Sequence, residues 1–234
     1  MVWSDTYHSW LLYDSKIKTE EINIEDEVLN DSEVCFALCV VTLTVSAQGD
    51  NEAEIRHQIE SAAVSMKTMQ CDFVQTKYLR MLNDKMVSTG KMYYQQSDKL
   101  RWEYTSPYTY AFVLNGSKVL ISKGSRSDVI NVNQSKFFKE IARIMMNSVV
   151  GKALNDKRDF KVSISATSSE YVATLIPQQK QLQQMFQKII LHFNRQQAMV
   201  AKVELIEKRG DRTVIEMKHV KVNSPINAKT FIVN

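Results

Sequence analysis

Histidine, cysteine and serine side chains are the usual carriers of catalysis, and their spacing in this chain argues against an enzyme. Beyond residue 47, His57, His192 and His219 are scattered, with no second histidine or cysteine at metal-ligand spacing. No serine stands in a Gly-x-Ser-x-Gly elbow, and no glycine-rich phosphate loop occurs. Carboxylates such as Asp211 and Glu216 fit ordinary turn and strand positions. We therefore expect no enzyme activity, no metal site and no cofactor.

The sequence favours apolar binding instead, because the run from Gly90 to Gly116 contains seven aromatic rings. Side chains in a strand alternate between two faces, so apolar residues at every second position line one face of three consecutive strands. The turn signal Asn115-Gly116 ends this antiparallel meander. With Phe73 from the preceding strand, the shared face is expected to carry Phe73, Met92, Tyr94, Leu100, Trp102, Tyr104, Tyr110, Phe112 and Leu114.

Two interpretations of this face remain open from the pattern alone. It is either an ordinary sheet surface packed on a core or the wall of a cavity. A nucleic-acid surface is disfavoured, because the rings share their face with Met and Leu while Lys99 and Arg101 fall on the opposite face.

Hydrophobic periodicity predicts an α+β fold dominated by antiparallel strands. Helices are expected at 51–69, 135–150 and 180–186. Strands are expected at 71–81, 86–96, 100–104, 110–114, 118–122, 128–132, 160–165, 171–176, 188–194, 200–207 and 212–219, with a last extended segment at 228–233.

The chain divides into an N-terminal extension with a signal peptide, residues 1–47, and a single domain, residues 48–234. The uncharged stretch from Val34 to Ala47 has the length of a signal-peptide apolar region, and Val45-Ser46-Ala47 fits the small-x-small cleavage rule. The alternative is a buried strand, and Asp31 and Glu33 before the stretch count against a signal peptide, because the region before its apolar stretch should be basic. Export would leave Cys71 as the one cysteine and a chain with 28 bases and 17 acids, a formal charge of +11.

That positive charge includes six bases around the early strands. They are either a steering surface for acidic protein loops or anionic headgroups, or an ordinary solvated face. The six are Lys77, Arg80, Lys85, Lys91, Lys99 and Arg101.

The order of motifs resembles the outer-membrane lipoprotein carrier family, the LolA-like periplasmic lipoprotein chaperones. The resemblance covers nearly all of 52–231, including Leu100-Arg101-Trp102-Glu103-Tyr104 before Ser106-Pro107, Asn115-Gly116, and Gly210-Asp211-Arg212-Thr213. It implies a strongly curved, incompletely closed antiparallel barrel of about eleven strands, with short helices covering the concave face. The apolar residues above would then line a lipid cavity.

The resemblance also implies function and partners. It implies a periplasmic monomer that carries acylated lipoproteins from an inner-membrane lipoprotein-releasing transporter to an outer-membrane acceptor. The lid helix would be formed by Phe137, Phe138, Ile141, Ile144 and Met145. Gln96 stands where the family has a latch arginine, so we expect a weaker latch, because glutamine lacks the charge and five-donor fork of arginine.

An alternative keeps the fold and changes the cargo. Such a relative would bind another lipid, a glycolipid or a pigment, or would sense lipid for a signalling partner. An apolar hollow selects by volume and hydrophobicity, so the sequence does not separate these cargoes.

Overall fold

The computed structural model of this chain describes residues 51–96, 98–134, 143, 146, 147, 151–155 and 157–233. The fold below belongs to the unit from Ala47 to Asn234. The predicted signal segment lies outside the described residues. So do the predicted lid residues Phe137, Phe138, Ile141, Ile144 and Met145.

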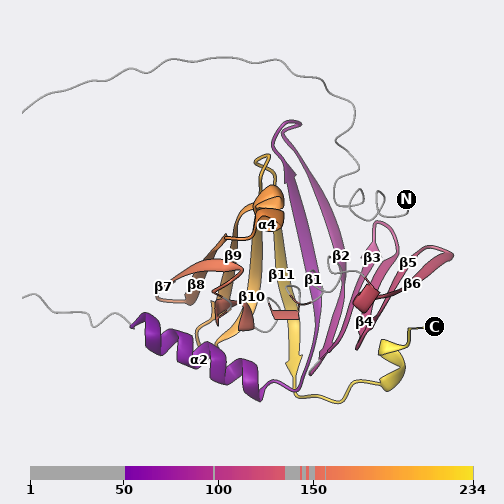
Figure 1. Cartoon of the computed structure of the whole chain (residues 1–234), viewed down its shortest axis with the longest axis horizontal. Helices are drawn as coiled ribbons and strands as arrows, with labels where there is room; N and C mark the ends of the chain where they lie inside the picture. The colour runs from indigo at the N-terminus through magenta and orange to yellow at the C-terminus, as the bar shows by residue number, and fades with distance from the viewer. Residues whose placement is uncertain are drawn as a thin grey trace, which may run out of the picture. The chain divides into compact units, whose positions relative to one another are not determined.

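Eleven antiparallel strands form one sheet in the order β6-β5-β4-β3-β2-β1-β11-β10-β9-β8-β7 (Figure 1). The strands are β1 (Thr68–Leu79), β2 (Asp84–Gln95), β3 (Lys99–Ser106), β4 (Tyr110–Asn115), β5 (Lys118–Lys123), β6 (Arg126–Asn131), β7 (Phe160–Ala166), β8 (Glu170–Pro177), β9 (Phe186–Asn194), β10 (Met199–Glu207) and β11 (Arg212–Val222). β6 and β7 are the two edges, so the sheet stays open. The predicted fold class, an incomplete barrel of about eleven strands, is confirmed.

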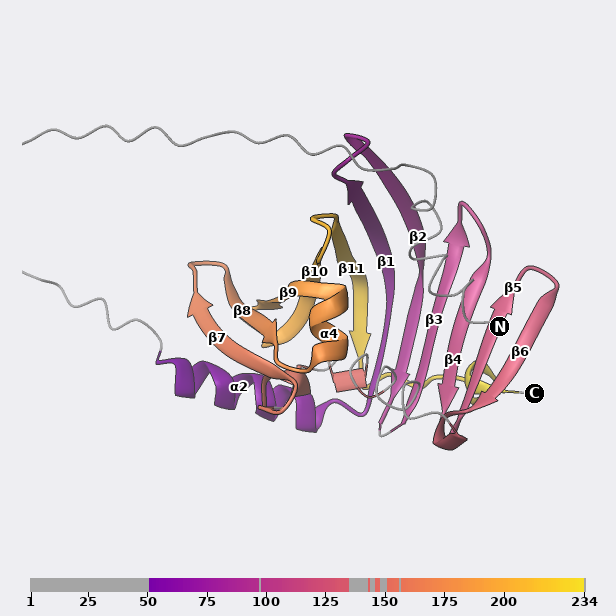
Figure 2. The same ribbon diagram turned by 45° about the horizontal axis from the view of Figure 1, so that its top comes forward.

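The sheet curves, and two helices lie on its concave side (Figure 2). Helix α2 (Glu52–Ser65) begins at Asn51, whose side chain accepts a hydrogen bond from the Ala53 N–H, and two acids occupy its first turn. Its buried face packs against β7 and β10. The short helix α4 (Lys180–Met185) contacts β8 and β9, with Leu182 buried.

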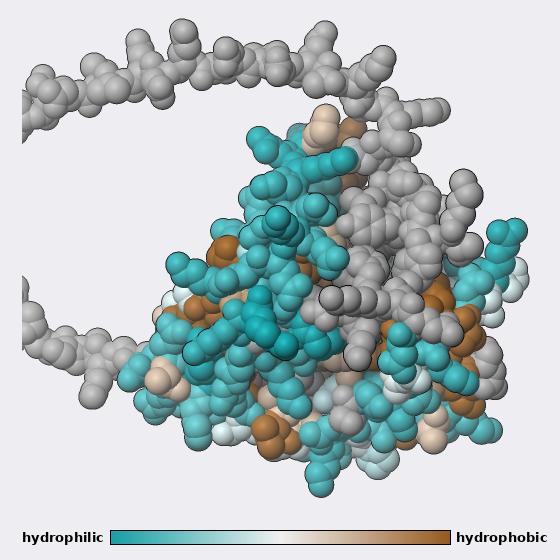
Figure 3. Space-filling model, viewed as in Figure 1, coloured by the Kyte–Doolittle hydropathy of each residue, from teal (hydrophilic) through white to brown (hydrophobic). Residues whose placement is uncertain are grey.

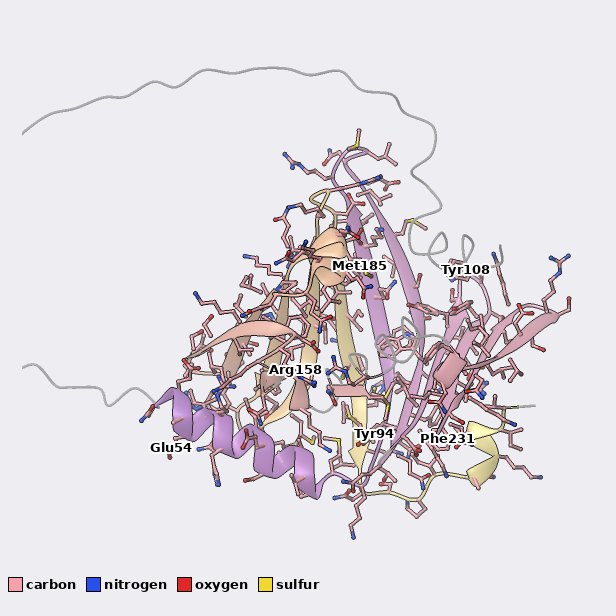
Figure 4. All side chains as sticks on the ribbon, viewed as in Figure 1. Glu54, Tyr94, Tyr108, Arg158, Met185 and Phe231 are labelled. Atoms are coloured by element: carbon pink, nitrogen blue, oxygen red, sulfur yellow. The ribbon has the colours of Figure 1, made fainter. Side chains whose placement is uncertain are left out.

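The opposite face of the sheet is covered in part by the end of the chain. The 3-10 helix η3 (Ala228–Phe231) contacts β3 and β4, and the Asn115 side chain donates a hydrogen bond to the Phe231 carbonyl at 2.9 Å (Figure 4). This packing buries Phe231 and leaves Val113 no solvent-exposed surface. The prediction of an extended segment at 228–233 is therefore wrong, because Asn227 caps a helical turn there by accepting from the Lys229 N–H.

Two further 3-10 turns are η1 (Val132–Gln134) and η2 (Lys152–Asn155). Within the described part of the chain, no helix has both the length and the apolar character needed to cross a bilayer.

Candidate functional site

The strand register places all nine predicted cavity residues on one face of β1–β4. Residues directly opposite each other in a ladder project from the same face. Met92 pairs with Trp102, and Trp102 with Phe112. Parallel rows run through Tyr94, Leu100 and Leu114, and through Phe73, Gly90, Tyr104 and Tyr110. We call the nine residues Phe73, Met92, Tyr94, Leu100, Trp102, Tyr104, Tyr110, Phe112 and Leu114 the apolar wall.

Ring stacking holds the centre of the apolar wall together. Phe73 stacks on Trp102 with ring centroids 4.4 Å apart and meets Tyr104 edge-on at 5.2 Å. Tyr104 also lies 6.0 Å from Tyr110 and 6.3 Å from Tyr108 in the β3–β4 loop (Figure 4). Offset and edge-to-face pairs of this kind add to the stabilisation from burial alone.

Gly90 makes this packing possible. The Phe73 ring lies over Gly90 in the middle of β2, so a Cβ there would come within 2.5 Å of the ring and 2.0 Å of the Glu103 carbonyl oxygen. The glycine therefore marks a close approach of ring and backbone.

The polar groups of the apolar wall differ in whether they have a hydrogen-bond partner. The Tyr104 hydroxyl donates a hydrogen bond to Gln75 Oε1 at 2.9 Å, and burial raises the pKa of Tyr104. The buried indole nitrogen of Trp102 has no partner with hydrogen-bond geometry in the described part of the chain, although the indole interacts favourably with the Tyr104 oxygen. A buried N–H without an acceptor is uncommon and costly.

The apolar face continues beyond the wall across the rest of the sheet. Phe73 pairs with Met217 on β11, and a further row joins Ile215, Val203 and Leu191. α2 packs on this face at its far end, where the Tyr171 hydroxyl donates to Gln58 at 2.9 Å. The result is one continuous apolar surface inside the curve.

In this structure the apolar wall is covered. Met92 and Leu100 have no exposed surface, and only Phe112 is half-buried. Burial also raises the pKa of the Cys71 thiol, which lies on this face opposite Met92, to about 12 and so favours its protonated form. A cavity of about 410 Å³ at the start of α2 is lined by Asn51, Glu52, Ala53, Arg56, His57 and Glu60. Those charged residues do not suit an acyl chain.

The predicted latch residue, Gln96, follows β2 in a turn and is exposed. Its backbone N–H donates to the Lys67 carbonyl at 2.8 Å, which ties the turn to the segment between α2 and β1. Next to the predicted lid, the helical residue Met146 is buried, and Arg143 donates to the buried Asp159 carboxylate.

Four strands are joined on the opposite face by a polar network that sequence reasoning missed. His192 lies between two carboxylates, with Nδ1 3.0 Å from Glu170 Oε1 and Nε2 3.0 Å from Glu204 Oε1. Arg212 donates to the second oxygen of Glu204 at 2.9 Å, and Lys202 lies 3.4 Å from its first. Glu170, His192, Glu204 and Arg212 lie 8 to 42 positions apart in the sequence. Only the alternation of side chains between the two faces could have suggested that they meet.

Burial by itself would raise the pKa of Glu204. The hydrogen bond and charge of Arg212, aided by Lys202 and His192, outweigh burial and hold the pKa below its ordinary value of 4.5. The network has the geometry of a structural clamp between strands. No group of three potential metal ligands is found within the described residues.

The six predicted basic residues do not form one surface. Lys77 shares the face of Phe73 and Gln75, and its ammonium lies 3.2 Å from Glu207 and 3.8 Å from Asp211. On the other face, Lys91 binds Asp72 and Arg101 binds Glu103, at 2.9 and 2.8 Å. Lys77 therefore lies on the opposite face from Lys91 and Arg101, because residues two apart in a strand share a face.

The sequence profile described as outer membrane lipoprotein carrier protein LolA matches residues 64–234. An outer-membrane lipoprotein carrier protein of Legionella pneumophila (strain Lens) is 26% identical over 200 residues, which cover 85% of this chain and 93% of that protein. One from Methylococcus capsulatus is 34% identical over 68 residues, 29% of this chain and 33% of that protein.

A solved structure, the LolA superfamily protein NE2245 from Nitrosomonas europaea, aligns with 78% of this chain and 97% of its own, at 13% identity and a TM-score of 0.44. The profile match covers well over half of the chain. This chain therefore belongs to the LolA family of outer-membrane lipoprotein carrier proteins.

Proposed function

We propose that this chain is a periplasmic carrier that holds the acyl chains of lipoproteins against the apolar wall and moves them from the inner to the outer membrane. The observation that carries the proposal is the continuous apolar face inside an open, curved sheet. Family membership supports a lipid-binding carrier of this kind. The inner-membrane transporter, the outer-membrane acceptor and the monomeric state are parts of the same proposal.

Energetics require that the carrier bind only part of its cargo or open to release it. Each buried acyl methylene is worth about 0.8 kcal/mol, so sealing a whole triacyl anchor would prevent release. The wall residues are buried in this structure, so cargo must displace what covers them. In the proposal this cover includes the lid helix of Phe137, Phe138, Ile141, Ile144 and Met145.

The indole N–H of Trp102 supports a cargo that carries a carbonyl group. An ester or amide oxygen at the head of an acyl chain would supply an acceptor for this buried donor, which has none with hydrogen-bond geometry among the described residues. Trp102→Phe keeps a ring in the wall and removes the donor. We expect the wild type to prefer an ester-linked lipid over its ether-linked analogue by about three- to tenfold, and the variant to lose that preference.

This test is read in a competition assay with the two lipids, with circular dichroism to confirm that the variant folds. An unchanged ester-to-ether ratio would show that Trp102 makes no such contact. The ratio, rather than the affinity, is the readout because it cancels any general loosening of the wall.

The proposed function itself is tested by native mass spectrometry of the protein expressed in a bacterial periplasm, followed by extraction of bound lipid. Co-purified triacylated lipoprotein is the expected result. Small lipids or glycolipids alone would favour the alternative cargo, and a protein free of lipid would count against any carrier role.

A wall variant provides the matched control for this experiment. Phe112 is half-buried, so Phe112→Lys places a charge in the wall without a large cavity, whereas Val129→Lys makes a similar change on the exposed surface of β6. We expect only the first to reduce bound lipoprotein.

The latch role of Gln96 remains a proposal. If Gln96 holds the lid, Gln96→Ala will raise the rate of lipid uptake and Gln96→Arg will lower it, because arginine offers more donors and a charge. Uptake is followed by fluorescence of a lipid probe. Equal rates in all three proteins would remove the latch assignment.

A further inference from the structure

The hairpin joining β1 and β2 extends beyond the strands on both sides of it. β1 pairs with β11 only as far as Tyr78, and β2 pairs with β3 only from Thr89 onward. The segment between these limits therefore has no second strand neighbour, and Figure 1 shows it protruding from the sheet. Asn83, at a φ of 47°, makes the turn, a conformation that asparagine tolerates well. We call residues 78–87 the hairpin tip; it begins at Tyr78, the last residue of β1 that pairs with β11.

The hairpin tip exposes an unusual amount of apolar surface. Among the described residues, ten large hydrophobic side chains are exposed, and five of them lie on these ten positions. Met81 is the most exposed at 74%, and the apex is apolar in Figure 3. The five are Tyr78, Met81, Leu82, Met86 and Val87. Clustered exposed apolar residues mark interaction sites, whereas single ones do not.

Basic residues surround this apolar tip. Arg80 and Lys85 are exposed on the hairpin itself. The Arg80 backbone N–H donates to Asp211 Oδ1 at 2.9 Å, which holds the neighbouring turn, with Lys208 and Arg209 exposed on it, beside the hairpin.

The bases around the tip outnumber the acids: Lys77, Arg80, Lys85, Lys208 and Arg209 against Asp84, Glu207 and Asp211. Glu207 and Asp211 both lie within ion-pair distance of Lys77. Asp84 is the exposed acid of the tip, and its side chain accepts from the Lys85 backbone N–H. The tip therefore combines exposed hydrophobic side chains with an excess of cations.

We propose that the hairpin tip docks on the surface of an anionic phospholipid bilayer, with Met81 and Leu82 entering the interface and the bases contacting headgroups. A narrow convex protrusion suits insertion between lipids better than packing on a folded protein, which requires a broad complementary surface. Neither apolar contacts nor charge alone anchors a protein firmly to a membrane, and the hairpin tip supplies both. This inference does not depend on the cargo, because docking involves a different part of the molecule from the apolar wall.

Co-sedimentation with vesicles tests the proposal. The full chain is mixed with vesicles of phosphatidylcholine containing about a quarter phosphatidylglycerol, and with pure phosphatidylcholine vesicles. We expect binding to the anionic vesicles that weakens as salt is added. Met81→Asp/Leu82→Asp should reduce the partition coefficient at least about tenfold, and Arg80→Gln/Lys85→Gln should reduce it by about fivefold for each base and flatten the salt dependence.

Matched controls make the same chemical changes elsewhere. Val64→Asp/Val129→Asp changes two exposed apolar residues, and Lys67→Gln/Lys118→Gln removes two exposed cations, all outside the hairpin tip. The apolar segment 34–47 is present in every variant, so any binding through it is common to all. Tip variants that bind like their controls would overturn the proposal. A wild-type protein that binds neither kind of vesicle would also overturn the proposal, and a protein partner would then be tested.

Discussion

At the scale of single residues, the apolar wall depends on Gly90. Its position in β2 lets the Phe73 ring reach across and stack on Trp102. The sequence shows a glycine at this point, but which ring crosses it follows only from the register of β1 against β2. A glycine inside a strand is a known sign of such close approach.

Gly90→Ala is expected to lower the free energy of unfolding by about 1–3 kcal/mol, because the new methyl group overlaps Phe73 and the Glu103 carbonyl. Urea denaturation followed by tryptophan fluorescence measures the change. Thr89→Ala, on the adjacent residue and the opposite face, serves as the control and should cost less than about 1 kcal/mol. Equal costs would mean that the packing over Gly90 is not tight.

At the scale of elements, the network of Glu170, His192, Glu204 and Arg212 ties β8, β9, β10 and β11 together. Ladder hydrogen bonds already join these strands, so the side chains add a second connection across them. Their contribution depends on pH through Glu204, whose pKa is lowered in the folded protein.

The sign of that dependence follows from linkage. A carboxyl group with a lowered folded pKa stabilises the fold fully above the unfolded pKa, near 4.5, and this stabilisation is lost as pH falls through the folded value. Glu204→Gln should therefore lower the free energy of unfolding by about 1–3 kcal/mol near neutral pH. It should also make that free energy less sensitive to acid below about pH 4.5. The measurement is a series of urea midpoints against pH.

Glu216→Gln is the matched control, because Glu216 pairs with Lys218 at an exposed site on β11. We expect Glu216→Gln to change the free energy of unfolding by no more than about 0.5 kcal/mol. Parallel pH curves for wild type and Glu204→Gln would contradict the role given to the network.

At the scale of the whole molecule, the predicted division at residue 47 would determine where the protein works. Export would remove the acidic first segment and leave a basic carrier domain with one cysteine. We predict a mature N-terminus near Gln48, to be read by intact-mass spectrometry of protein recovered from a bacterial periplasm. Recovery of a mature species that begins at Met1 would exclude cleavage.

Local patterns in the sequence were sufficient to predict the strands and the residues of the apolar wall. Two-residue periodicity and turn signals depend on neighbours along the chain, so the eleven strands and the shared face of Tyr94, Trp102 and Phe112 could be predicted from them. The closing segment 228–233 was not predictable in this way, because its structure rests on capping and on packing against β3 and β4.

The tertiary structure decided which distant groups meet and which stay exposed. Phe73 over Gly90, His192 between two carboxylates and Phe231 on the outer face all depend on strand order, which periodicity does not specify. The hairpin tip is the clearest case. Its residues look like an ordinary strand end in sequence, and they become an exposed apolar tip only because β3 and β11 end before them.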